Sequence, residues 1–155
     1  MSSLFDTPIR MAREMRQRYF SDDCSPMSAF AGIFRDYHIE LQYESHGDSL
    51  RREGETYIIT LPHNTSPERD VYTIAHEIGH IVLGHKLDDA GMLFRSGELT
   101  PEERQANVFA AELLMPKEQF RKVCSDCGNN VYEVAFRFGV SPAAAGVRMA
   151  ILGIA

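Results

Sequence analysis

The sequence predicts a mostly helical α+β fold with a small antiparallel sheet. Apolar residues recur at helical spacing in several segments, two short segments have the composition of strands, and serine, proline or glycine marks the boundaries between them. The length of 155 residues, of which 44% are hydrophobic, is enough for one domain with a packed core. We expect a single domain over residues 1–155, with a core in 1–116 and a C-terminal helical subregion in 117–155.

Two helices and two strands are expected in the first part of the chain. Pro8–Phe20 has the pattern of an amphipathic helix, and a second helix begins at Ser25 and runs to about Tyr37. Ile39–Glu44 and Thr56–Leu61 are the predicted strands, joined by a hairpin with its turn around Gly54. The residues expected to face inward are Ile9, Ala12, Met15 and Tyr19 in the first helix and Met27, Phe30, Ala31, Phe34 and Tyr37 in the second.

The next predicted helix contains the motif His76-Glu77-Ile78-Gly79-His80. Ser66 and Pro67 are typical of a helix start, and Gly84 is typical of a helix stop. The apolar stripe between them predicts a buried helix and consists of Val71, Ile74, Ala75, Ile78, Ile81 and Val82. Because buried imidazoles need partners, this context favours a metal site over the alternative of two histidines exposed on a helix surface.

The spacing of the motif suits a metal ion. Residues i and i+4 of a helix lie on one face, so His76 and His80 can offer two nitrogens to the same ion. Glu77 lies roughly 100° further round the helix, within reach of a water molecule on that ion. Two imidazoles beside a carboxylate favour Zn²⁺, which lowers the pKa of its water to about 7, and Mn²⁺ accepts the same ligands.

A third protein ligand must come from elsewhere. In an extended form of the motif, a third histidine ligand would stand at position 86. This chain has Lys86 there, and His85 is one place out of register. The segment Thr100–Pro116 is predicted to form another helix, on which Glu103 has two competing roles. It is either a metal ligand or the acidic member of a capping box that begins at Thr100. Glu112 points to the opposite side of this helix.

Two separated blocks of the chain resemble the ImmA/IrrE family of zinc metallopeptidases. One block runs from Thr73 through the motif to His85, and the other runs from Glu103 to Pro116 with the pattern Glu-x-x-Ala-Asn-x-Phe-Ala-Ala-x-Leu-Leu-Met-Pro. The resemblance implies a zincin-like fold and an endopeptidase that cleaves a helix-turn-helix transcriptional repressor, in a prophage, mobile-element or stress-response setting. The alternative is a non-catalytic, zinc-containing protein-binding module that acts on a regulator.

The resemblance also implies the roles of individual residues. His76, His80 and Glu103 match the gluzincin-like zinc ligands, and Glu77 matches the catalytic glutamate. Asn107 lies one turn after Glu103 on the same face, where its side chain either supports His76 from outside the ligand set or packs within the helix. An extended substrate needs an edge strand, for which Tyr57–Leu61 is the candidate. The donors considered for an oxyanion, among which the sequence does not choose, are His38, Tyr43, His46, His63 and Tyr72.

The last part of the chain has the spacing of a helix-turn-helix, from Val131 to Arg148. Its second helix offers alanines and a single arginine, and the net charge is −6, so direct DNA binding is not expected.

Cys124 and Cys127 are expected to be reduced thiols at a helix end. The chain has neither a membrane-spanning apolar run nor a signal-peptide pattern, so we expect it to be cytoplasmic. The segment Lys86–Leu99 is expected to be a loop.

Overall fold

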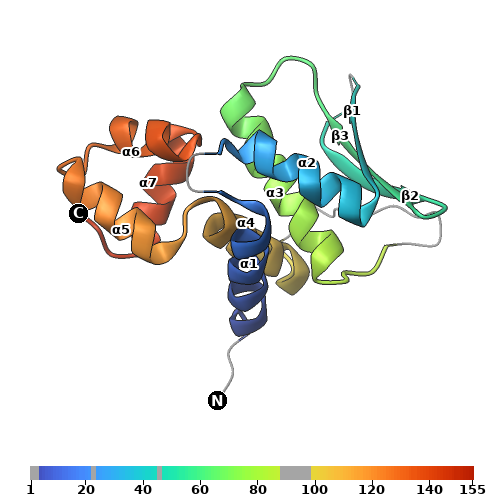
Figure 1. Cartoon of the computed structure of the whole chain (residues 1–155), viewed down its shortest axis with the longest axis horizontal. Coiled ribbons are helices and arrows are strands. Elements are labelled where there is room, and N and C mark those ends of the chain that lie inside the picture. Colours follow the sequence, from blue (N-terminus) through green and yellow to red (C-terminus); the bar gives the residue numbers. More distant parts are fainter. Residues whose placement is uncertain (1–3, 22–23, 45–46, 88–98) are drawn as a thin grey trace.

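The computed structural model describes residues 4–21, 24–44, 47–87 and 99–155. It confirms a mostly helical α+β fold, with the sheet at one end and the last three helices at the other (Figure 1). The elements are α1 (Asp6–Tyr19), α2 (Pro26–Tyr37), β1 (Ile39–Tyr43), β2 (Ser49–Glu53), β3 (Thr56–Leu61), α3 (Pro67–Val82), α4 (Pro101–Leu114), α5 (Lys117–Asp126), α6 (Val131–Phe138) and α7 (Pro142–Ile151). In this part of the chain no helix is long and apolar enough to cross a membrane.

Side-chain caps explain why several helices begin where they do. Ser25, Ser66 and Ser141 each accept a hydrogen bond from the backbone N–H three residues later, and a proline follows each of them directly. A cap satisfies one of the N–H groups that a helix start leaves without a partner, and proline has no N–H to lose there. The predicted starts of α2 and α3 are therefore confirmed.

The sheet is mixed, which corrects the expectation of an antiparallel sheet. Residues 49–53, part of which was expected to be a turn, form the strand β2. It pairs antiparallel with β3, and β1 pairs parallel with β3 on the other side, giving the order β1-β3-β2. Gly54 has a φ of +62° and turns the chain between β2 and β3. The expectation that Tyr57–Leu61 is an edge strand is thus wrong, because both of its edges are already paired.

The inward faces of the first two helices were predicted in part. Ala12 and Met15 are buried in α1, while Ile9 and Tyr19 are only partly buried. In α2 the prediction is right for Phe30, which is fully buried, and Phe34 and Tyr37 are partly buried. It is wrong for Met27, which is 43% exposed, and for Ala31, which is also exposed. The other buried residues of α2 are Ala29 and Ile33.

The helices α3 and α4 pack closely at the centre of the molecule. A Cβ atom on Gly79 would lie 3.0 Å from the ring of Phe109 and 3.3 Å from the Cα of Ala106, so a larger residue would push α4 away. Ala106, Phe109 and Ala110 are fully buried. Small residues on both helices, Gly79 on α3 and Ala106 on α4, therefore let the two backbones approach closely.

The C-terminal helices α5, α6 and α7 pack on one another beside the core (Figure 1). The predicted helix-turn-helix spacing is realised by α6 and α7, with the turn at Gly139, whose φ is +69°. Cys124 lies in α5 and Cys127 caps its C-terminal end, both as free thiols. The division of one domain into residues 1–116 and 117–155 stays a prediction.

Candidate metal centre

Three predicted ligand groups converge between α3 and α4. The Nε2 atom of His76 lies 2.8 Å from Glu103 Oε2 and 3.1 Å from His80 Nε2. His80 Nε2 lies 3.1 Å from Glu103 Oε1. The helical spacing puts the two histidines on one face of α3, and the close packing of the helices brings the carboxylate of α4 to them. The structure thus brings His76, His80 and Glu103 together as one group.

The distances among these three groups suit one small divalent ion. Donor atoms that bind zinc tetrahedrally at about 2.0–2.1 Å stand about 3.3 Å from one another. The separations of 2.8–3.1 Å are slightly shorter and need only a small outward shift. Two imidazole nitrogens and one carboxylate also form a donor set that zinc commonly accepts.

Burial distinguishes the residues of this centre. His80 is 1% exposed and Glu77 is fully buried, whereas the side chain of Glu103 is 18% exposed. Glu77 Oε1 lies 3.9 Å from His76 Nε2, beside the ligand group but not within the converging set. The centre therefore opens towards solvent on the side of Glu103, and Glu77 forms part of its buried wall.

Glu103 occupies a helix start and a ligand position at once. Its backbone N–H donates to the Thr100 hydroxyl over 3.1 Å, so the cap of α4 is present. Its carboxylate, however, faces His76 and His80. The helix does not begin before Thr100, as a purely interior ligand would require. The backbone of Glu103 thus takes part in the cap that the Thr100 side chain makes, while the Glu103 carboxylate lies with the two imidazoles.

A chain of hydrogen bonds that the sequence did not predict supports His80. Its Nδ1 lies 2.8 Å from Nδ1 of His85, and His85 Nε2 lies 2.8 Å from Gln105 Oε1. Because an amide oxygen only accepts, His85 donates from Nε2. In a neutral His85 ring Nδ1 then accepts, and His80 donates to it from Nδ1. In a neutral His80 ring this leaves a lone pair on Nε2, facing Glu103. A lone pair directed at a carboxylate is stabilised by a cation between them.

The position of His85 follows from the end of α3. Gly84 has a φ of +71°, and the chain folds back so that the His85 N–H donates to the His80 carbonyl over 3.0 Å. In the sequence, His85 is one place out of register for a ligand, and no role beside His80 was predicted for it. The signal that was available is a histidine directly after a glycine stop, five residues after a candidate ligand.

The structure places Asn107 away from the ligands. Its side chain lines a cavity together with Tyr72 and Thr73, and among the described residues no hydrogen bond joins it to a histidine. Support of His76 by Asn107 therefore stays a prediction. Tyr72 lies one turn before His76 on α3, and burial raises the pKa of its hydroxyl, which remains a donor at neutral pH.

The other candidates for an oxyanion donor lie elsewhere. Tyr43 stacks on His63 with ring centroids 6.3 Å apart, and His38 is exposed at the C-terminal end of α2. His46 lies outside the described residues, as does most of the expected loop Lys86–Leu99. The choice among these donors is left open.

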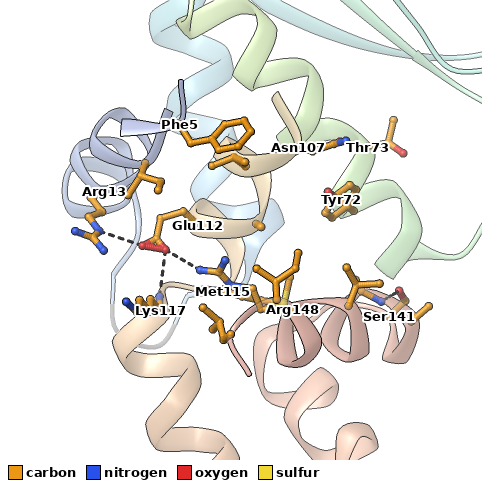
Figure 2. Close-up of a pocket in the computed structure, with 18 of the residues that line it drawn as sticks. Phe5, Arg13, Tyr72, Thr73, Asn107, Glu112, Met115, Lys117, Ser141 and Arg148 are labelled. Carbon is orange, nitrogen blue, oxygen red and sulfur yellow. Dashed lines mark hydrogen bonds and ion pairs between the residues drawn. The ribbon is translucent and has the colours of Figure 1, made fainter. Parts of the chain in front are cut away.

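Glu112 lies on the far side of α4 from Glu103, as predicted, and joins the C-terminal helices to the core (Figure 2). Its carboxylate accepts from Arg148 Nη2 over 2.9 Å and from Arg13 Nε over 3.0 Å. It also accepts from the backbone N–H of Lys117 over 3.1 Å. Arg148, the single arginine in the second helix of the predicted helix-turn-helix, is thus buried in an ion pair and packs against the core.

Comparisons with known proteins agree with this architecture. Residues 33–150 match the family model described as the IrrE N-terminal-like domain, a peptidase family. A solved structure described as a Mycobacterium tuberculosis transcriptional regulator has a similar fold, with a TM-score of 0.69 over 93% of this chain at 18% sequence identity. The chain spans only 46% of that structure. Among curated proteins, none is similar enough in sequence to count as a relative.

Proposed function

The chain belongs to the IrrE N-terminal-like peptidase family, and on this basis we propose that it is a zinc-dependent endopeptidase that cleaves a helix-turn-helix transcriptional repressor. The observation that carries the proposal is the convergence of His76, His80 and Glu103, with Glu77 buried beside them. Zinc is the preferred ion because the donors are two imidazoles and one carboxylate, and Mn²⁺ is the second choice.

The residues of the centre divide the work of peptide hydrolysis. A divalent ion held by His76, His80 and Glu103 would polarise the peptide carbonyl and lower the pKa of a water molecule to about 7. Glu77 accepts a proton from the attacking water molecule while the water oxygen forms a bond to the carbonyl carbon. The same carboxyl group then donates that proton to the leaving amine as the C–N bond breaks.

The proposed substrate rests on the family resemblance and on the geometry of the sheet. A repressor must present its scissile segment in an extended form to lie along a strand. Since β3 is central, the edges that can receive it are those of β1 and β2. Cleavage at a single site is expected, because a folded repressor exposes few extended segments.

Metal dependence provides the direct test of the proposed activity. The purified protein is incubated with the repressor encoded beside its gene, after treatment with a chelator and after re-addition of Zn²⁺ or Mn²⁺. We expect discrete repressor fragments with metal, none after chelation, and recovery on re-addition, as seen on a denaturing gel and by mass spectrometry. Absence of fragments under every metal condition would contradict the proposal.

Metal affinity is expected to depend on the hydrogen bonds behind His80. Replacing His85→Ala leaves the three ligands in place but removes the group that orients the His80 ring. We expect zinc affinity to fall about 10–100-fold, as is usual for the outer partners of ligating histidines. Gln105→Ala should act in the same direction through His85. Competition with a chromophoric chelator measures the change.

The control for this prediction is His63→Ala, which removes an exposed histidine outside the centre. Its zinc affinity should equal that of the unaltered protein. Unchanged affinity in both His85→Ala and Gln105→Ala would show that the hydrogen-bond chain does not support the metal.

A non-catalytic binding module is the second candidate function. The observation that favours it is a pair of exposed aromatic residues one turn apart on α6, Tyr132 and Phe136, which are 71% and 87% exposed. Exposed aromatic side chains are enriched at protein interfaces. This function predicts stable binding of the repressor without fragments, and loss of that binding in Phe136→Ala but not after chelation.

A further inference from the structure

A cavity of about 920 Å³ lies between α1, α3, α4 and α7, apart from the group of metal ligands. Much of its wall is apolar and includes Ile9, Val108, Val147 and Ile151. Val147 and Ile151 are 60% and 69% exposed, so they form an open apolar side rather than part of the packed core. Pockets for small organic ligands have volumes of roughly 300–1,000 Å³ and mostly apolar walls with a few polar groups.

One end of the cavity is basic. Figure 2 shows Arg13, Lys117 and Arg148 around the carboxylate of Glu112 at this end. Three positive groups against one negative group leave two positive charges in excess. The remaining basic residue of the wall, Arg69, is already paired with Asp48 and Asp70.

Two of the three basic side chains, Arg13 and Arg148, are held by hydrogen bonds to Glu112, and the side chain of Lys117 is exposed beside them. The side chain of Arg148 is 10% exposed, and its Nε donates to the Met115 carbonyl over 3.0 Å. Burial lowers the pKa of Arg148, and the Glu112 carboxylate beside it offsets part of this decrease. Glu112 is shared with Arg13, so one carboxylate serves two guanidinium groups. A second carboxylate at this end would reduce the excess from two positive charges to one.

The opposite end of the cavity is polar, and Arg69, one turn before Tyr72 on α3, is paired there with Asp48 and Asp70. Tyr72, Thr73 and Asn107 lie together there, facing the apolar space (Figure 2). Tyr72 precedes His76 by one turn of α3, and Asn107 follows Glu103 by one turn of α4. A molecule in the cavity would therefore touch the two helices that carry the metal ligands, one turn away from them.

We propose that this cavity binds a small amphiphilic carboxylate, with its charged group at Arg13, Lys117 and Arg148 and its apolar body along α4 and α7. The proposal does not depend on peptidase activity, because no lining residue belongs to the ligand group. The charge excess selects an anion, and the apolar wall selects a hydrocarbon or aromatic body. The volume of the cavity lies in the range of pockets that bind small molecules. A stable protein interface instead buries a broad surface, of roughly 800 Å² on each partner.

Titration calorimetry with decanoate tests the proposal, with decan-1-ol as the uncharged probe of equal chain length. We expect saturable binding of one decanoate per chain, at least about tenfold tighter than decan-1-ol, since charge-assisted hydrogen bonds are the stronger kind. Lys117→Gln and Arg13→Gln should each weaken decanoate binding several-fold and leave decan-1-ol binding unchanged. Both replaced side chains are largely exposed, so these variants should fold.

Two further variants complete the experiment. Ala144→Phe places a ring in the cavity and should abolish binding of both probes, whereas Lys122→Gln on α5 lies outside the cavity and should bind normally. Equal affinity for decanoate and decan-1-ol, or decanoate binding that survives Ala144→Phe, would overturn the proposal. Saturable binding of an acidic amphipathic peptide but not of decanoate would assign the cavity to a protein partner and overturn it as well.

Discussion

Replacing Glu77→Gln is expected to reduce repressor cleavage about 10²–10⁴-fold while zinc content stays at one ion per chain. The amide has nearly the same shape as the carboxylate but cannot accept a proton from water. Glu77 is fully buried beside His76 and does not belong to the group of three ligand donors, so metal binding should persist. Fragment formation over time measures the first effect, and elemental analysis of the purified variant measures the second.

The matched control is Glu68→Gln, which changes an exposed glutamate in the first turn of the same helix. It alters the charge of α3 equally but lies far from the ligands along the helix, so cleavage should be unchanged. Undiminished cleavage by Glu77→Gln would contradict the proposed proton transfer. Loss of zinc in that variant would instead assign Glu77 a role in holding the centre together.

Replacing Glu112→Gln is expected to lower the free energy of unfolding by about 3–5 kcal/mol, the usual effect of removing one partner from a buried ion pair. The side chains of Glu112 and Arg148 are only 4% and 10% exposed, so the variant leaves a guanidinium buried without its counter-charge. Arg13 contributes less, because its side chain is 58% exposed and water screens its charge. Equilibrium unfolding in urea measures the change.

Two comparisons make this prediction specific. Glu118→Gln removes an exposed carboxylate from the neighbouring helix α5 and should change stability by no more than about 0.5 kcal/mol. The double variant Glu112→Leu with Arg148→Met removes both charges and should recover much of the loss. A stability unchanged by Glu112→Gln would show that the pair does not join α7 to the core.

The helices were predictable from the sequence wherever a cap and an apolar stripe coincided. Ser66, Pro67 and Gly84 marked α3 to within a residue or two, and the segment from Thr100 to Pro116 marked α4 equally well. The strand β2 was not predictable, because three of its five residues, Arg51, Arg52 and Glu53, are charged. Arg51 lies across the sheet with hydrogen bonds to Thr60 and Gln42, which its sequence neighbours do not reveal. Parallel pairing of β1 with β3 depends on the path of the chain between them, which periodicity does not encode.

The convergence of the candidate ligand groups was predictable to the extent that it is local. Helical spacing placed His76 and His80 on one face, but only the packing of α4 against α3 decides where the Glu103 carboxylate points. His85 escaped prediction because its position depends on the reversal of the chain at Gly84 rather than on continuation of the helix. The cavity could not have been predicted, since helices from distant parts of the sequence form it together.

The contact of Gly79 with α4 also bears on how readily the centre takes up an ion. Glycine within a helix costs about 1 kcal/mol relative to alanine, and here it lets the backbones of α3 and α4 meet at Ala106. The separation of the donor groups is thereby set by the meeting of two backbones rather than by flexible side chains. Most of the conformational entropy that ordering these donors requires is lost during folding, so ion capture needs little further ordering and should be fast.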